Sequence, residues 1–481
     1  MNYLSIDVGT TGCKCQLFSE RGEILKYIFN EYDFKVINNS YYVDVHAIED
    51  NLRSMIREVS GEYEISSVCV SSLGEAFVLL DRDDNILFYP MLYTDPRGEE
   101  EAEVIKRTVG EERAFSITGA IPHSMYSLPK LLWIKNNYPE FYAKADKAML
   151  IGDYVGYLLT GERVIDYALA ARTGAFDVEK MEFSGEMLEP FGIKPTLFSK
   201  PRRAGCKVGQ LKREWGCDAT LILGSHDQVS AALGAGALDS GDAACGMGTV
   251  ECITALFDGS VVSVEMGRQG YCRVPYAIPG IYCTYLLNYS CGSTVNWFRK
   301  KIMHGYSGGE GSFFEYIEKG MKDGPTGILT LPYFGGASTP YGDAGAKGAI
   351  INLTTETSDS ELYRSIMEGT AMEMRLNAEC VREYGIEIRS LVATGGGANS
   401  DVWLGIKAEI QKVPIKTLRS SEGGLCGLAM LQAVAMGGAV DLVCARGIFV
   451  RYEKEFLPGE SRYEKQYEKY KRLYKTVKEL Y

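Results

Sequence analysis

The sequence lacks the two commonest motifs by which proteins bind nucleotide phosphates. No Gly-Lys dipeptide occurs in its 481 residues, which excludes a P-loop. Four pairs of glycines have the spacing Gly-x-Gly, but none has a third glycine three residues later, so the dinucleotide-binding fingerprint is also absent. A nucleotide would therefore have to be bound by turns of another kind.

Histidine is scarce and closely spaced cysteine pairs are missing. The chain has four histidines and thirteen cysteines, an odd number, and no two cysteines form a Cys-x-x-Cys pair. These features argue against a zinc site and against a framework of disulfides. The sequence predicts buried free thiols in a reducing compartment.

Long apolar runs and an excess of positive charge are missing as well. No stretch approaches the roughly 18 apolar residues of a membrane span, and Asp7 lies where a signal peptide needs an apolar run. With 51 basic and 63 acidic residues the net charge is −12, which argues against binding to nucleic acid or to an anionic membrane. We therefore predict a cytoplasmic protein that acts on a small molecule. The sequence leaves a homodimer open.

A strand–turn–strand pattern occurs twice in the chain. The opening segment is predicted to form three strands, a helix and a fourth strand, at residues 3–8, 13–19, 24–29, 47–59 and 65–70. This order places a meander beside a parallel crossover, which predicts an α/β fold. Residues 242–257 repeat the strand, the Gly-Thr turn and the next strand. We therefore expect two halves of similar build, residues 1–240 and 241–481.

Both Gly-Thr turns are candidate phosphate sites. Glycine lets successive backbone N–H groups approach an anion, and threonine hydroxyls add donors. Asp7, just before the first turn, can hold Mg²⁺ through water, and Lys14, just after it, can reach a phosphate. The candidate phosphate ligands in the turns are Thr10, Thr11, Gly248 and Thr249. Two ordinary β-turns would look similar, although the duplication and the flanking charges favour a functional site.

A run of three glycines marks a third candidate site. A strand is predicted at residues 392–394 and a helix from Asp401 onward. Between them lie Gly395, Gly396, Gly397, Ala398 and Asn399. Consecutive glycines cost backbone entropy, which the close approach of a ligand such as adenosine would justify. A tight contact between helix and strand is the alternative.

One aspartate is the candidate catalytic base. Asp227 follows a short predicted strand, residues 221–223, and precedes a helix of small residues, where open α/β sheets bind ligands. Phosphorylation of a hydroxyl needs a carboxylate to accept the proton. An aspartate with an ordinary pKa of about 3.9 is ionised near neutral pH. The alternative is that Asp227 caps the helix.

A second polar cluster follows the strand predicted at residues 65–70. Its members Glu75, Asp95 and Arg97 can hydrogen-bond a polyhydroxylated substrate. Residues of surface salt bridges would give a similar pattern.

At these residues the sequence resembles the FGGY carbohydrate kinases, a branch of the actin/hexokinase/Hsp70 ATPase superfamily. The resemblance covers nearly the whole chain, although the second family signature matches only in part, because Asn352 stands where a glycine is usual. The matching segments are Asp7-x-Gly9-Thr10-Thr11 and Gly246-Met247-Gly248-Thr249 for the two phosphate loops, Gly395-Gly396-Gly397-Ala398-x-Ser400-x-x-Trp403 for the adenosine motif, and residues 125–137 for the first signature.

The resemblance implies two RNase H-like domains of the actin-like ATPase type, with ATP and a sugar in the cleft between them. It also implies that ATP and Mg²⁺ are used. By this resemblance Asp227 is the general base, Gln228 contacts the substrate, Thr249 binds phosphate and Asp7 organises the metal.

The predicted acceptor site matches no subgroup of the family. Xylulose-kinase-like members usually read Met-His-Gly where this chain has Gly74-Glu75-Ala76, whereas Glu75 looks like the glutamate of glycerol kinases. We therefore expect an ATP-dependent kinase of a small sugar or polyol, with pentuloses such as xylulose, other ketoses, polyols and aldonates as candidates. The alternative is an actin-like ATP-binding sensor or scaffold that transfers no phosphate and needs no acid at position 227.

Overall fold

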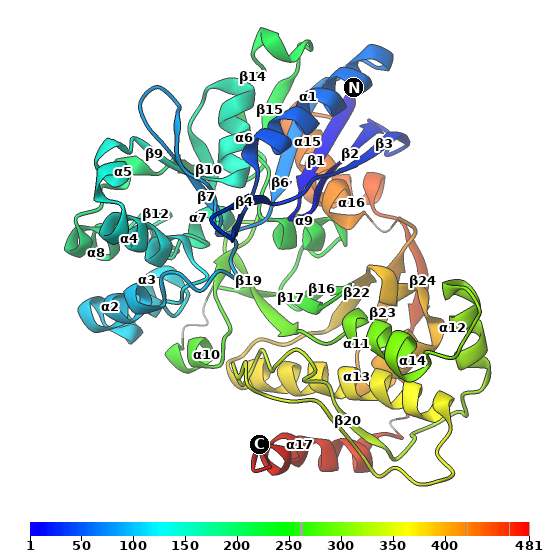
Figure 1. The fold of residues 1–481 in the computed structure, drawn as a ribbon. Helices are drawn as coiled ribbons and strands as arrows, with labels where there is room; N and C mark the ends of the chain where they lie inside the picture. The colour runs from blue at the N-terminus through cyan, green and yellow to red at the C-terminus, as the bar shows by residue number, and fades with distance from the viewer. Residues whose placement is uncertain (260–262, 421, 461, 481) are drawn as a thin grey trace.

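The first half of the chain is built on a mixed six-stranded sheet (Figure 1). The computed structural model describes residues 1–259, 263–420, 422–460 and 462–480. The strands are β1 (Asn2–Val8), β2 (Gly12–Ser19), β3 (Ile24–Glu31), β6 (Ser67–Ser72), β14 (Lys207–Gln210) and β15 (Thr220–Ile222). Their order in the sheet is β14-β15-β6-β1-β2-β3.

The second half is built on a seven-stranded sheet. Its strands are β16 (Asp242–Met247), β17 (Glu251–Asp258), β18 (Val274–Pro275), β19 (Ile281–Asn288), β22 (Ser390–Thr394), β23 (Ile415–Leu418) and β24 (Tyr452–Phe456). They are ordered β18-β19-β17-β16-β22-β23-β24.

The two sheets share one topology. In the first, β1 pairs antiparallel with β2 and parallel with β6, and β15 extends the parallel side. In the second, β16 pairs antiparallel with β17 and parallel with β22, and β23 extends the parallel side. This confirms the predicted α/β fold with its repeated strand–turn–strand unit. The exact boundary between residues 240 and 241 stays a prediction.

Helices cover the sheets, and β1 is therefore buried on both faces along most of its length. Along β1, Leu4, Ile6 and Val8 pack in one core cluster with residues of the first helix, while Tyr3 belongs to the other cluster. The helices of the first half are α1 (Val45–Glu62), α2 (Glu99–Val109), α3 (Glu111–Thr118), α4 (Ser127–Asn137), α5 (Pro139–Lys144), α6 (Ile151–Thr160), α7 (Tyr167–Ala171), α8 (Gly185–Leu188) and α9 (Asp227–Gly234).

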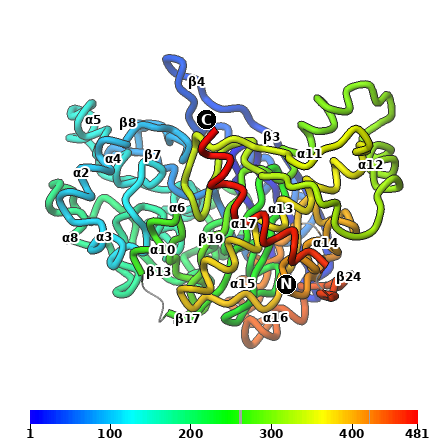
Figure 2. The backbone as a smooth tube through the Cα atoms, turned by 90° about the horizontal axis from the view of Figure 1, so that it is seen from below, coloured from blue at the N-terminus to red at the C-terminus, as the bar shows by residue number. Residues whose placement is uncertain are grey.

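The second half contributes the remaining α-helices of the described chain. They are α10 (Val264–Arg268), α11 (Gly292–Trp297), α12 (Glu310–Lys319), α13 (Asp359–Glu383), α14 (Asp401–Gln411), α15 (Gly423–Met436), α16 (Leu442–Phe449) and α17 (Glu464–Lys478). The longest, α13, starts with a capping box in which Ser358 and Glu361 satisfy each other's backbone N–H groups. The closing helix α17 lies against α13, as Figure 2 shows from below, and it also contacts strand β20 (Leu329–Leu331).

Several smaller sheets surround the two main ones. The sequence predicted that the first three strands lead directly into the helix. In the structure a hairpin of β4 (Lys35–Ile37) and β5 (Ser40–Tyr42) lies between β3 and α1. Its turn is formed by Asn38 and Asn39, both with positive φ, as asparagine tolerates. The other small strands are β7 (Phe77–Leu80), β8 (Ile86–Phe88), β9 (Lys147–Leu150), β10 (Val164–Asp166), β11 (Phe176–Asp177), β12 (Glu182–Phe183), β13 (Lys200–Arg202) and β21 (Ala349–Ile351).

Helix α15 belongs to the second half by sequence but packs against α9, β1 and β6 of the first half (Figure 1). The two helices touch through their backbones, since a Cβ at Gly234 would lie 1.7 Å from the Gly423 carbonyl oxygen. Further along α15, the buried Gln432 accepts a hydrogen bond from Ser67 at 2.8 Å and donates one to Ser5 at 3.2 Å. The two halves are therefore joined by a buried, closely fitted contact.

All thirteen cysteines are free thiols, and most are buried, as predicted. Among the described residues, no helix combines the length and the apolar character needed to cross a membrane. The cytoplasmic location stays a prediction.

Candidate active site

The predicted base, Asp227, lies where α9 begins, at the junction of the two halves. It is the first residue of that helix. The N-cap position is occupied by His226, so Asp227 does not cap the helix. Its Oδ1 atom is buried, has no hydrogen-bond partner among the described residues and lies 3.2 Å from Nε2 of His226. The side chain as a whole is 35% exposed, and this exposure falls on its other atoms. The carboxyl group is therefore accessible from one side only.

The pKa of Asp227 is not the ordinary value that the sequence suggested. Burial raises it to about 6, against the opposing effects of hydrogen bonding with Gln228 and of the positive charges of Arg172 and Lys14. A carboxylate with this pKa is still mostly ionised at pH 7 and is a stronger proton acceptor than an ordinary aspartate. Gln228 thus hydrogen-bonds the candidate base, and its contact with the substrate stays a prediction.

A buried carboxylate behind the base fixes the loop that carries it. Asp166 Oδ2 accepts a hydrogen bond from Ser225 Oγ at 2.7 Å, two residues before Asp227. The same carboxylate accepts from the backbone N–H groups that open α7, and this short helix leads directly into Arg172. Asp166 therefore holds two segments of the site in one arrangement.

The first predicted phosphate turn joins β1 and β2 next to Asp227. The sheet register explains its side chains, because Asp7 is paired across β2 with Lys14 and across β6 with Ser71. Asp7 Oδ1 accepts from Ser71 Oγ at 2.6 Å, and Oδ2 lies 3.5 Å from Lys14 Nζ. Lys14 also forms a 2.7 Å ion pair with Glu422 of the second half. Asp7, the predicted metal ligand, and Lys14, the predicted phosphate ligand, therefore belong to one ionic network.

The charges of the two carboxylates are coupled. Burial raises the pKa of Asp7, the Lys14 ammonium lowers it, and the negative charge of Asp227 raises it again. Within the described part of the chain, neither Thr10 nor Thr11 uses its hydroxyl in a hydrogen bond to another residue, and Thr11 is exposed. These hydroxyls and the turn are available to a ligand beside Asp227.

The second predicted turn and the glycine run lie side by side. Parallel pairing of Gly246 with Thr394 brings the ends of β16 and β22 together. Gly395 has a φ of +84°, and a Cβ there would lie 2.9 Å from the Met247 carbonyl oxygen. A Cβ on Gly397 would meet the Met247 side chain at the same distance, whereas one on Gly396 would meet nothing within 4 Å.

Two of the three glycines are therefore explained by close packing, which was the alternative to ligand binding, and the third borders open space. The run continues as a short 3-10 helix through Ala398 and Asn399, after which Ser400 caps α14. Gly248 and Thr249 are exposed on the turn beside it. Gly396 and Asn399 are also exposed, and contacts of these residues with adenosine and phosphate stay a prediction.

The polar cluster around Glu75 is a buried ion pair rather than a surface salt bridge. Arg172 Nε donates to Glu75 Oε1 at 2.5 Å, and both side chains are 6% exposed. The Arg172 guanidinium also lies over the rings of Tyr126, at 5.0 Å, and Tyr285, at 5.6 Å. A Cβ on Gly74 would meet His226 Nε2 at 3.0 Å, so a side chain at this position would crowd the imidazole.

His226 connects this ion pair to the base. Its Nδ1 atom lies 3.1 Å from the Tyr285 hydroxyl, and Nε2 faces Asp227. Burial and the nearby Arg172 lower the pKa of His226 to about 4, so the ring is neutral at pH 7. Asp227 thus has a neutral neighbour on its buried side.

Asp95 and Arg97, the other predicted substrate contacts, bind each other. Arg97 Nε donates to Asp95 Oδ1 at 2.8 Å, and Arg97 also donates to the Tyr42 hydroxyl at 2.7 Å. The buried Lys130 donates to the backbone carbonyl of Asp95 at 2.6 Å. Asp95 and Arg97 therefore form a salt bridge, which was the alternative to substrate binding. Their contact with the substrate stays a prediction.

The comparison with known proteins decides the family. The N-terminal domain of the FGGY family of carbohydrate kinases matches residues 2–234, and its C-terminal domain matches residues 243–436. The chain belongs to the FGGY family of carbohydrate kinases. It is an α/β enzyme of the actin-like ATPase fold that uses ATP to phosphorylate a sugar hydroxyl. Neither the family match nor the relatives support the alternative of a sensor without phosphoryl transfer.

Similar proteins match this kinase along nearly its whole length. A xylulose kinase from Staphylococcus epidermidis is 27% identical over 99% of this chain and 97% of its own length. The structure of a xylulose kinase from Brucella ovis superposes with a TM-score of 0.90 at 26% identity, with both chains fully covered. A gluconate kinase from Lactobacillus acidophilus shares the fold, with a TM-score of 0.88 at 24% identity over all of this chain and 98% of its own.

The sequence of this kinase did not reveal Arg172 and Tyr285 as parts of the site. Arg172 is 97 residues from Glu75, and Tyr285 comes from the other half, so no local pattern joins them. His226 stands next to Asp227 in the sequence, and this adjacency was the one feature that could have identified His226 as part of the site. The missed residues are those that depend on the meeting of distant segments.

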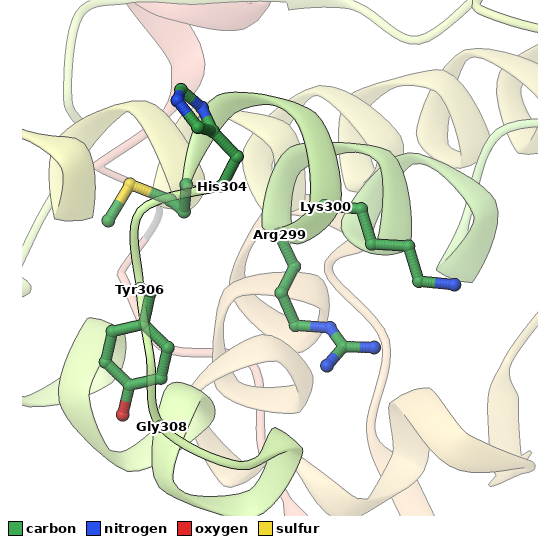
Figure 3. Close-up of a pocket in the computed structure, with 6 residues that line it drawn as sticks. Arg299, Lys300, His304, Tyr306 and Gly308 are labelled. Carbon is green, nitrogen blue, oxygen red and sulfur yellow. The ribbon is translucent and has the colours of Figure 1, made fainter.

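A further pocket of this kinase, about 200 Å³ in volume, lies after α11 in the second half. Figure 3 shows Arg299, Lys300, His304 and Tyr306 at its edges, with His304 projecting away from the two other basic side chains. Arg299 forms an ion pair with Glu310 at 3.3 Å. The basic groups do not converge, and we assign the pocket no part in catalysis.

Proposed function

We propose that this kinase transfers the γ-phosphoryl group of ATP to a hydroxyl of a pentulose such as xylulose, or of a closely related polyol, with Asp227 as the base. The observation that carries the proposal is the position of Asp227, whose one-sided carboxyl group lies between the Asp7–Lys14 network and the Glu75–Arg172 pair. The xylulose kinases that match this chain from end to end support the substrate class.

In the proposed reaction the acceptor hydroxyl gives its proton to Asp227 while its oxygen forms a bond to the γ-phosphorus. The bond between the γ-phosphorus and the bridging oxygen breaks, and ADP leaves with that electron pair. Hydroxyls of Thr10, Thr11 and Thr249, with backbone N–H groups of the two turns, would hold the phosphoryl oxygens. The surface of Gly395, Gly396, Gly397, Ala398 and Asn399 would receive the adenosine.

Asp7 is the proposed protein contact of Mg²⁺. No group of three or more potential ligands is clustered in the described residues, so the protein offers no cage of its own. A single carboxylate beside the phosphate turn fits Mg²⁺, which usually keeps several waters and is completed by substrate phosphates. When bound, the ion would neutralise charge on the transferring group, and Lys14 would share in that task.

The test is an ADP-release assay with Mg·ATP and a series of pentuloses, other ketoses and polyols. We expect turnover with xylulose or a near relative, and loss of about 10²–10⁴-fold in kcat when Asp227→Asn removes the proton acceptor. Binding of ATP, measured by calorimetry, should be nearly unchanged in that variant. Full activity of Asp227→Asn would refute the base assignment, and no turnover with any acceptor would refute the proposed substrate class.

A further inference from the structure

The buried ion pair beside the base presents a cation whose charge is already neutralised. Arg172 donates to Glu75 Oε1 through its Nε atom, and its terminal nitrogen contacts the same oxygen. Gly74, the residue before Glu75, packs against both Arg172 and His226, and His226 Nε2 faces Asp227. The third guanidinium nitrogen lies 3.8 Å from the sulfur of Cys272, which is a weak partner. Arg172 is therefore close to the acceptor side of the site but has no uncompensated charge.

Lys14, whose positive charge also acts on Asp227, is paired in the same way, because it is bound to Asp7 and Glu422. His226 is neutral at pH 7 because burial and Arg172 lower its pKa. Within the described part of the chain, each cation around the base thus faces a carboxylate of the protein itself.

The shape of the Glu75 segment shows that this pairing is built into the fold. Glu75 has a φ of +61°, an uncommon conformation for a residue with a side chain. Its backbone carbonyl accepts a 2.6 Å hydrogen bond from the buried Ser127 at the start of α4. The chain is therefore held in an unfavourable conformation that directs the carboxylate toward Arg172.

We infer that Glu75 occupies, from within the protein, the place that a substrate carboxylate would take on Arg172, and that the kinase thereby selects uncharged acceptors over aldonates. This inference rests on the proposed function and adds the determinant of charge selectivity. The fold itself does not determine whether the acceptor is charged, because solved structures that share it are named for xylulose and for gluconate. An aldonate would meet a charge-balanced site and would add an unpaired anion beside Asp227, which is unfavourable.

The experiment compares matched acceptors that differ only at one end. Each pair consists of a polyol and the aldonate of the same configuration, such as xylitol with xylonate and glucitol with gluconate, with xylulose as the reference substrate. The ratio of kcat/KM for the aldonate to that for its polyol is measured by ADP release in the wild type and in Glu75→Gln. The matched control is the double variant Glu75→Gln/Arg172→Gln, in which both charges are gone.

We expect the wild type to prefer the uncharged member of each pair. Glu75→Gln exposes the charge of Arg172 and should raise the aldonate-to-polyol ratio by about tenfold or more, as a charge-assisted hydrogen bond to a carboxylate allows. The double variant should show no such rise. Calorimetric binding of xylonate without ATP gives a second measure that does not depend on turnover.

The outcomes separate the two proposals. A wild type that prefers aldonates overturns the charge inference and leaves the kinase assignment intact, as does an unchanged ratio in a folded Glu75→Gln variant. If Glu75→Gln does not fold, the aldonate-to-polyol ratio of the wild type and the binding of xylonate to the double variant still test the inference. A wild type that phosphorylates neither series nor xylulose overturns the proposed function itself.

Discussion

The two Gly-Thr turns occupy the same place in the two halves, but charge is used differently around them. At the first turn, Asp7 and Lys14 stand opposite each other on β1 and β2 and face the junction between the halves. At the second, Glu251 begins β17 completely buried and is paired with the equally buried Lys407 of α14. Equivalent backbone scaffolds thus carry reactive charge in one copy and structural charge in the other.

This difference indicates a division of labour between the halves. The first half supplies ionisable groups next to the proposed acceptor site, including Asp227. The second half supplies an exposed turn and a glycine surface whose geometry depends on tight packing of backbone against backbone. Repetition of the fold has kept the topology and has let the side chains diverge.

The sharpest contrast is expected between Glu251→Gln and Asp7→Asn. Removing one partner of the buried Glu251–Lys407 pair leaves an uncompensated charge in the core, and we expect the free energy of unfolding to fall by about 3–5 kcal/mol. Burial already raises the pKa of Asp7, so the folded state disfavours its charge, and Asp7→Asn should change stability by less than about 1 kcal/mol. Urea denaturation measures both.

The activities should show the reverse order. Asp7→Asn should weaken the dependence of turnover on Mg²⁺ and lower kcat, while Glu251→Gln, assayed well below its unfolding temperature, should keep the wild-type Mg²⁺ dependence. Equal losses of stability in the two variants would break the proposed contrast between functional and structural charge.

A second contrast concerns pH. As the proposed base, Asp227 would act in its ionised form, and its pKa of about 6 means that this form predominates above pH 6 and is lost below it. We therefore expect kcat/KM for the acceptor to fall about tenfold per pH unit below about pH 6. Thermal melting in the same buffers separates this effect from unfolding. Activity that stays constant down to pH 4.5 would show that another group takes the proton.

The smallest effects should come from the glycine run of the second half. Gly395→Ala forces a side chain into a left-handed conformation against the Met247 carbonyl and should lower stability by about 1–2 kcal/mol. Gly396→Ala meets nothing within 4 Å, so the melting temperature should not change, while KM for ATP should rise about fivefold, on the order of 1 kcal/mol. Should Gly396→Ala leave ATP binding untouched, the adenosine would have to lie elsewhere.

Much of the scaffold could be predicted because it is encoded locally. The strands of each meander, the Gly-Thr turns and the aspartate that follows β15 all lie within short, strongly patterned segments. The exposed β4–β5 hairpin escaped prediction because its three-residue strands carry little hydrophobic pattern and its Asn-Asn turn was the one signal.

The electrostatics of the site could not be predicted from local sequence. Asp227 has a raised pKa because the meeting of both halves buries it, and Glu75 is neutralised by a residue from the segment after α7. Sequence patterns name the ionisable groups of a site, but their protonation and pairing are decided only when distant segments come together.

The close fit of α15 against the first half has a consequence for how the chain can be divided. A cut near residue 240 separates the two repeats in sequence, yet it would strip β1, β6 and α9 of the helix that covers them and leave Ser5 and Ser67 without their partner Gln432. Fragments 1–240 and 241–481 should therefore fail to fold apart and should regain activity when they are produced together. The kinase is therefore a single folding unit, although the side chains of its two halves have diverged.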